Sequence, residues 1–241
     1  DVITIATGGS TAATFNADQS VSLSGALTVT GTVTMSGGQA IPGKIEGTNF
    51  TDSLLIGHST TGTLSSAEDN TGVGIGALSS LTSGDDNTAL GSNTGVLVNT
   101  GFRNTLIGSK SGDSITTGQS NTAVGFNSLI ASSTSDKNTA VGAYALQTVT
   151  GANNIAIGFG AGGNISSGDG NVIIGSADAD SATADKQLKI ADGVDGTVTW
   201  IQGDNTGKVS FPGNDGAGLS ILSSTISTAA SNSDITLTPH G

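Results

Sequence analysis

The sequence predicts an all-β chain organised as a repetitive parallel β-solenoid, or β-roll, with coils of about 17 residues. A pentapeptide of the type Asn-Thr-Ala-Val-Gly recurs eight times within residues 53–175, and successive copies start 17, 17, 17, 17, 17, 16 and 17 residues apart. Each copy alternates like a short strand and ends in glycine, and no helical segment is evident. Such a period is too short for a two-helix repeat or a propeller blade.

Aligning the copies on their first residue gives three uniform columns. The first position is Ser53 in the first copy and asparagine afterwards, at Asn70, Asn87, Asn104, Asn121, Asn138, Asn154 and Asn171. Three residues later the side chain is always aliphatic, at Ile56, Val73, Leu90, Ile107, Val124, Val141, Ile157 and Ile174. The next residue is always glycine, at Gly57, Gly74, Gly91, Gly108, Gly125, Gly142, Gly158 and Gly175.

The alternation within each copy suggests which strand face is buried. The residue one after the Asn is usually Thr and shares a face with the aliphatic residue three after it, so we expect this face to be buried. The residue between them is commonly Ala. Seven residues after the Asn the side chain is small, and eleven after it stands a second aliphatic column with Ser132 as its one exception. Each coil is therefore expected to hold two short strands.

The glycine and asparagine columns have physical causes. A chain that turns every few residues needs backbone shapes that a Cβ penalises, which accounts for the glycine. For the asparagine two interpretations stand side by side. Asn tolerates left-handed turns, and stacked amides can hydrogen-bond from coil to coil as a ladder.

Three zones follow from these patterns: an N-terminal β-strand shaft segment over 1–52, the repeat β-roll over 53–175, and a C-terminal β segment over 176–241 that leads to a missing distal part. A single coil buries too few aliphatic side chains to offset the entropy of ordering its residues. We therefore expect stacking, and packing against further copies, to provide stability.

Composition excludes several function classes. Of 241 residues 38 are glycine, aromatic residues make up only 3%, and the net charge is −12 with seven Lys and Arg. Scarce positive charge disfavours nucleic-acid binding. No apolar stretch is long enough for a membrane span, so membrane insertion is not expected. The absence of cysteine removes disulfides and thiol chemistry.

Few residues suggest chemistry, and we expect neither an enzyme nor a cofactor. His58 and His240 have no catalytic partners in the sequence. The pairs Glu68-Asp69 and Asp85-Asp86 fall at equivalent points of adjacent coils and should form a solvated acidic ridge. Acidic turns at 168–171 and 178–180 match no calcium-binding loop, so no metal site is predicted.

The few aromatic residues have structural interpretations. Trp200 and Phe211 flank a turn, where they could stack on a sugar but are expected to cap the repeat stack. Phe126, Tyr144 and Phe159 occupy similar positions in successive coils and should line an edge or a seam between chains.

The segment Asn138–Leu146, with its pentapeptide and trailing small residues, resembles the head repeats of trimeric autotransporter adhesins. That resemblance implies a left-handed parallel β-roll in which three chains share one axis. The usual coil of that family is shorter, so a 17-residue period implies a longer loop on one side.

Both flanks of the repeat array look like bacteriophage tail fibres, particularly those of phages that infect marine cyanobacteria. The similar segments are 23–31, 187–190, 198–204, 207–211 and 233–241. The resemblance implies a trimeric fibre whose distal part carries receptor recognition or a folding chaperone.

The expected function is that of a structural fibre protein: a trimeric β-solenoid section of a viral tail fibre that supports host attachment. Its implied partners are two further copies, other virion tail proteins, and host surface glycans or proteins. The alternative is a bacterial cell-surface adhesin that binds host or matrix through its repeat head. Ice binding through the Thr column, disfavoured by the expected burial, and a polysaccharide-cleaving tailspike are further alternatives.

Overall fold

The computed structural model describes the backbone of residues 3–7, 10–15, 21–23, 43–47, 49–57 and 61–212, and the side chains of 49–57 and 61–212. The chain divides into two compact units, Asp1–Pro42 and Gly43–Gly241. In the first unit, β1 (Ile3–Thr7), β2 (Ser10–Phe15) and β3 (Val21–Leu23) form an antiparallel sheet in the order β1-β2-β3.

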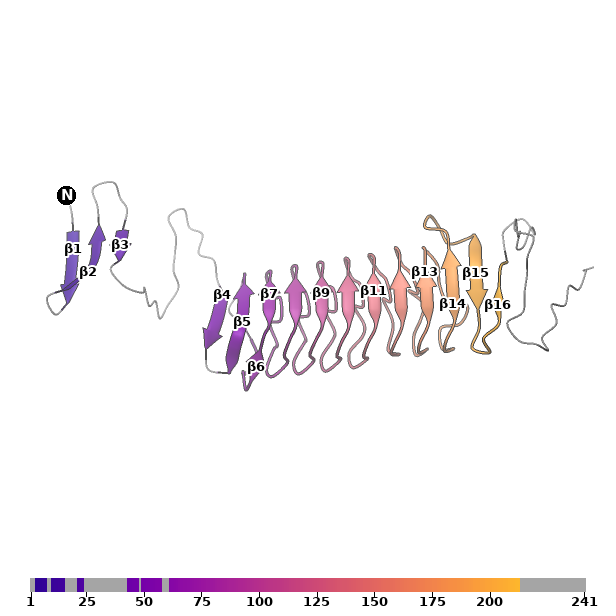
Figure 1. The fold of residues 1–241 in the computed structure, drawn as a ribbon, viewed down its shortest axis with the longest axis horizontal. Helices are drawn as coiled ribbons and strands as arrows, with labels where there is room; N and C mark the ends of the chain where they lie inside the picture. The colour runs from indigo at the N-terminus through magenta and orange to yellow at the C-terminus, as the bar shows by residue number, and fades with distance from the viewer. Residues whose placement is uncertain are drawn as a thin grey trace, which may run out of the picture. The chain divides into compact units, whose positions relative to one another are not determined.

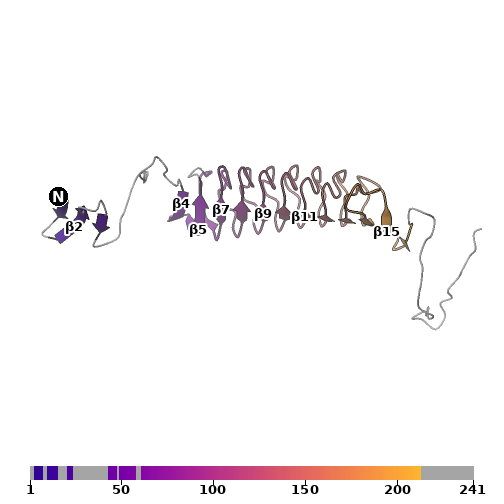
Figure 2. The same ribbon diagram turned by 90° about the horizontal axis from the view of Figure 1, so that it is seen from above.

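The second unit is the predicted parallel β-solenoid, with about eight coils and no helix among the described residues (Figures 1 and 2). One sheet runs along it in the order β16-β15-β14-β13-β12-β11-β10-β9-β8-β7-β5-β4, and β6 pairs with β5 at its side. The strands are β4 (Gly43–Gly47), β5 (Phe50–Ile56), β6 (Ala67–Glu68), β7 (Thr71–Val73), β8 (Thr88–Leu90), β9 (Thr105–Ile107), β10 (Thr122–Val124), β11 (Thr139–Val141), β12 (Ile155–Ile157), β13 (Val172–Ile174), β14 (Leu188–Ala191), β15 (Thr199–Gly203) and β16 (Val209–Ser210).

From β5 to β14, excepting the side strand β6, each strand pairs in parallel with the equivalent strand of the next coil. Val124, for example, is the register partner of Val141. Side chains one period apart therefore stack in the predicted columns. The prediction of two strands per coil was wrong: in the coils from β8 to β13 only the three residues after each Asn form a strand. The segment around Ser132 instead consists of turns, with left-handed backbone at Leu129 (φ 54°).

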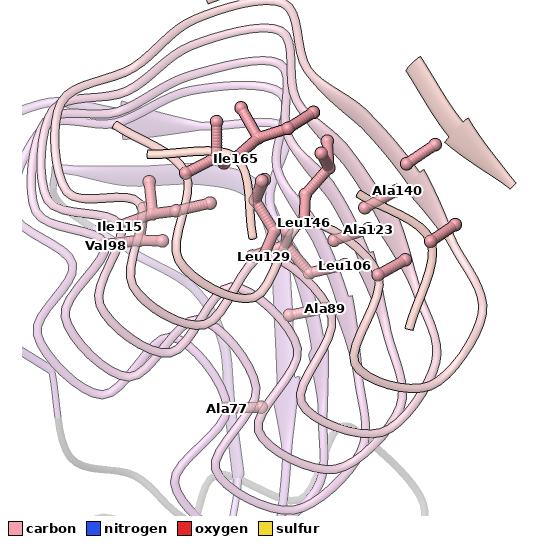
Figure 3. Close-up of a cluster of buried hydrophobic side chains, with 14 of the residues drawn as sticks. Ala77, Ala89, Val98, Leu106, Ile115, Ala123, Leu129, Ala140, Leu146 and Ile165 are labelled. Atoms are coloured by element: carbon pink, nitrogen blue, oxygen red, sulfur yellow. The ribbon is translucent and has the colours of Figure 1, made fainter. Parts of the chain in front are cut away.

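The interior of the coils is lined by the second residue after each Asn, not by the first and third. This position is fully buried in every coil, as at Leu106, Ala123 and Ala140 (Figure 3). The small residue at the seventh position and the aliphatic residue at the eleventh are buried as well, such as Ala145 and Val149. The expected burial of the Thr and aliphatic face was therefore wrong for the single chain.

Large and small side chains compensate for each other across this thin interior. The second and eighth positions face one another, and in no coil of the array are both large. Leu106 fills the space opposite two glycines: a Cβ at Gly95 or at Gly112 would lie 2.7 Å from a methyl carbon of Leu106. In two later coils the arrangement is reversed: the eighth position holds leucine, at Leu129 and Leu146, and the second holds alanine, at Ala123 and Ala140. The second and eighth positions together thus contribute at most one large side chain to each coil, beside the residue at the eleventh position.

The exception at Ser132 in the second aliphatic column has the same cause. In four of the other coils a glycine stands three residues after the aliphatic residue, and a Cβ at Gly118 would lie 3.4 Å from Ile115. In this coil that glycine is replaced by Ser135, and the two buried serine hydroxyls hydrogen-bond to each other. A polar pair thus replaces an apolar side chain and a glycine, which keeps both hydroxyls satisfied.

Antiparallel strands close both ends of the solenoid: β4 pairs with β5, and β14 is followed by β15 and β16. These strands pair the otherwise open sheet edges. The predicted capping role of Trp200 and Phe211 was wrong, because their side chains are 54% and 41% exposed. The turn between β14 and β15 is organised by the carboxylate of Asp192, which accepts hydrogen bonds from the backbone N–H groups of Val194, Asp195, Gly196 and Val198.

We predict that Leu106→Ala lowers the free energy of unfolding by about 2–5 kcal/mol, because it opens a cavity between two glycines. Gly112→Leu alone should also destabilise, by about 1–3 kcal/mol, through overpacking. The double variant should regain roughly half of the summed loss, since Leu129 and Leu146 already occupy this left-handed position in other coils. Denaturant unfolding at fixed protein concentration measures the stability of the two single variants and of the double variant. A double variant whose loss equals the sum of the two single losses would contradict the proposed size compensation.

We predict that the β14–β15 turn loosens in acid. Hydrogen bonds from the backbone, first that of Val198, lower the pKa of Asp192 from 3.8 to about 2. A carboxyl whose pKa is lower in the folded state stabilises the turn above its unfolded pKa, and this contribution is lost as the pH falls from about 4 to about 2. Hydrogen exchange of the Val194, Gly196 and Val198 amides should accelerate, relative to their intrinsic rates, in that window.

Asp192→Asn is the control for this titration, because the pKa of Asp204, in the turn between β15 and β16, is also lowered, chiefly by the Thr206 hydroxyl. The variant should show no change of protection at these amides between about pH 4 and pH 2. Equal protection of the native turn across this window would contradict the role given to the carboxylate.

Candidate functional site

The asparagine column forms a buried ladder in which the backbone N of each asparagine from Asn87 onward donates to Oδ1 of the asparagine one coil before. Asn104 donates from its backbone N and from Nδ2 to Oδ1 of Asn87, over 3.1 and 3.0 Å, and from Nδ2 to the Gly118 carbonyl over 2.9 Å. Asn121 repeats all three bonds one coil later. The ladder interpretation is therefore confirmed. The left-handed residue at this corner is not the asparagine but the residue before it, such as Ser120 (φ 57°).

Both ends of the ladder have polar partners other than asparagine. At the first coil the Ser53 hydroxyl accepts from the backbone N of Asn70 over 2.8 Å. At the last coil Gln187 donates from its backbone N and Nε2 to Oδ1 of Asn171, over 2.8 and 3.1 Å, and from Nε2 to the Ser181 and Ala184 carbonyls. Sequence reasoning missed Gln187, although its place 16 residues after Asn171 could have revealed it.

The glycine column is required by both conformation and space. All eight glycines have φ between +107° and +140°. A Cβ on Gly125 would lie 2.5 Å from the carbonyl carbon and oxygen of Gly142. Since backbone atoms cannot move aside, no other residue fits here without separating the coils.

The aliphatic column lies on the outer face of the sheet, beside the Thr column. Its members are half-buried or exposed, with Leu90 at 48% and Ile157 at 42%. Across β5 and β7–β13 no outward residue of the first or third position is charged. Seven strand spacings of about 4.8 Å and three residues of about 3.3 Å make this uncharged sheet face roughly 34 Å long and 10 Å wide. Such a surface on a single chain is typical of an interaction site.

An aromatic row borders the uncharged sheet face at the corner after the glycine column. The ring centroids of Phe126 and Tyr144 are 5.5 Å apart at 84°, and those of Tyr144 and Phe159 are 5.7 Å apart at 75°. These edge-to-face contacts link three successive coils. The rings thus line an edge of the coils, one of the two places expected from the sequence.

The acidic residues on the opposite turns connect coils. The Asp85 carboxylate accepts from the backbone N of Glu68 over 2.9 Å, so the two predicted acidic pairs do lie over one another. Asp136 accepts from Gln119 in the same way, over 2.9 Å. Asp169 accepts from Ala152 over 2.6 Å. These side chains supply acceptors for backbone N–H groups that would otherwise face solvent, which is a structural role.

The remaining candidate residues do not converge on a reaction centre within the described part of the chain. His58 and His240 lie outside the described residues. Among the residues described there is no group of three or more His, Cys, Asp or Glu side chains placed to hold a metal ion. Of the acidic turn at 178–180, Asp180 forms an ion pair with Lys189 over 3.0 Å.

Comparison of the chain with protein families, with curated proteins and with solved structures finds no match. Within the described ranges, no helix is both long and apolar enough to cross a membrane.

We predict that Asn121→Ala lowers the free energy of unfolding by about 2–4 kcal/mol, because three buried polar groups around it each lose a hydrogen-bond partner. The backbone N of Asn138, Oδ1 of Asn104 and the Ser135 carbonyl each lose a hydrogen bond. Thr134→Ala, at an exposed position of the same coil, is the matched control and should change stability by less than about 0.5 kcal/mol. Equal stability of the two variants in denaturant unfolding would refute the ladder's contribution.

Proposed function

We propose that this chain is a structural fibre protein, and that three copies associate through the uncharged sheet face to form a section of a viral tail fibre that supports host attachment. The observation that carries the proposal is the stack of about eight coils held in register by buried ladders, with an uncharged face along its side. Mechanical support needs such repetition, whereas catalysis needs a unique site.

The uncharged sheet face suits close packing against copies of itself. Its aliphatic and Thr side chains carry no charge, so burial would cost little desolvation. The strip of roughly 34 by 10 Å is less than half of the ~800 Å² per partner that a standard interface buries. A stable trimer would therefore also use further surface beside the strip.

The alternative, a bacterial cell-surface adhesin, is favoured by the aromatic row, because exposed rings on a repeat head offer a contact surface for host or matrix. Labelling of the chain on intact particles and cells by electron microscopy distinguishes the two. Label on virion tails supports the fibre, and label on bacterial surfaces supports the adhesin.

Ice binding was disfavoured because the Thr column was expected to be buried. Since this column is not buried in the single chain, that argument no longer applies. Thr71 and Thr88 are exposed and pair in register. A monomer with thermal hysteresis would support ice binding. A trimer that covers the face would leave these hydroxyls no access to ice.

We predict that the protein sediments at three times the 23.3 kDa of the chain, and that Val124→Lys shifts it to monomer at micromolar concentration. The substitution places a charge in the middle of the uncharged sheet face, where association would bury it. Ala131→Lys, at an exposed position away from the sheet, is the control and should remain trimeric. A native monomer, or a trimeric Val124→Lys variant, would contradict the proposed interface.

A further inference from the structure

The aromatic row does not serve the core of the solenoid. Phe126 and Phe159 are 44% and 63% exposed, and the interiors of their coils are filled by other apolar side chains, such as Leu129 and Ile165. Single exposed apolar residues need no explanation, but three rings in mutual contact on successive coils form a patch. The row must therefore be explained by what contacts it from outside.

The row ends at an open cavity of about 370 Å³ beside Phe159. Its volume lies in the range of small-molecule sites. Besides the ring, the cavity is lined by Ser176, Asp178, Lys189 and Asp195. It lies where the last repeat coil meets the β14–β15 turn, so two different elements supply its walls.

The wall formed by the turn is held rigidly. The Asp192 carboxylate accepts four backbone N–H groups of the turn, and these bonds hold its pKa near 2, so the turn is charged and closed at neutral pH. Gly196 lies so close to the Ser176 carbonyl that a Cβ there would clash with it. The Asp195 carboxylate accepts from N and Oγ1 of Thr197, over 3.1 and 2.8 Å. The lining groups are thus placed before any ligand binds.

The chemistry of this lining fits a sugar. An aromatic ring offers contact to the C–H groups of a sugar ring through dispersion. Carboxylates accept hydrogen bonds from hydroxyl groups. The Lys189 ammonium is already paired with Asp180, which leaves the charges of Asp178 and Asp195 unbalanced and disfavours acidic sugars. We infer that the aromatic row and the cavity beside Phe159 form a lateral binding site for a neutral or amino-sugar glycan.

This site goes beyond the mechanical function proposed above and does not depend on association, since one chain supplies all of its residues. The competing occupant of the row is a second copy of the chain. The polar lining of the cavity favours the glycan, because a seam between copies would bury Asp178 and Asp195 without cationic partners.

Saturation-transfer NMR with chitotetraose and maltotetraose, and with tetragalacturonate as the acidic comparator, tests the site on the full chain. At least one of the first two should bind, with resonance transfer from aromatic protons, and the third should not. Phe159→Ala should weaken binding about tenfold. Asp195→Asn, which keeps the acceptor for Thr197, should weaken it several-fold.

Two variants serve as matched controls. Ile75→Ala changes an exposed residue that holds the same place in its coil as Phe159, and Trp200→Ala removes an exposed ring that does not line the cavity. Both should bind like the native chain. Binding of neither neutral tetrasaccharide, binding of tetragalacturonate alone, or a loss confined to Trp200→Ala would each overturn the inference.

Sedimentation of the same samples separates this inference from the proposed trimer. If Phe159→Ala dissociates the trimer and no glycan binds, the row is a seam between copies and the glycan site is refuted. If glycans bind to a monomer, the site stands and the trimeric fibre does not.

Discussion

The structure depends on exact stacking of equivalent residues from coil to coil, and the buried asparagine ladder is the interaction that fixes it. Oδ1 of each asparagine accepts the backbone N–H of the ladder residue in the next coil, and Nδ2 of five of the seven asparagines also donates to Oδ1 one coil before. A shift by one residue would leave these buried amides unpaired. Register in a parallel sheet of three-residue strands would otherwise be weakly specified. The polar ladder thus specifies the arrangement that the small apolar core alone could not.

A thin cross-section explains most other features. Between the second and eighth positions the interior has room for at most one large side chain, so Leu106, Leu129 and Leu146 each face glycine or alanine. Corners follow one another closely, which requires the left-handed glycines. With little interior, the aliphatic residues of the strands and the aromatic rings must lie outside, where they are available for association or ligand binding. The unusual composition and the surface properties therefore have the same cause.

The period, the parallel stacking and the glycine column could be predicted from the sequence because they depend on spacing and on the backbone alone. The buried face could not be predicted by hydrophobicity: Val124 is more apolar than Ala123, yet the alanine lies inside. Side-chain size determines which residue points inward, because the leucine on the opposite wall leaves room only for a small residue. That signal was present in the sequence as an exchange between the second and eighth positions, for example Leu106 with Gly112 and Ala123 with Leu129. The lining of the cavity beside Phe159 depends on how the β14–β15 turn folds back, which no periodic pattern encodes.

The central claim, that residues one period apart lie over one another on the outer face while their neighbours point inward, is open to a direct test because the chain has no cysteine. Cysteines introduced at Val124 and Val141, which are register partners, should be joined within one chain by oxidation or by a short thiol-bridging reagent. The pair Val124 and Ala140, whose side chains lie on opposite faces, should not. Efficient bridging of the second pair, or of neither pair, on a non-reducing gel would contradict the account.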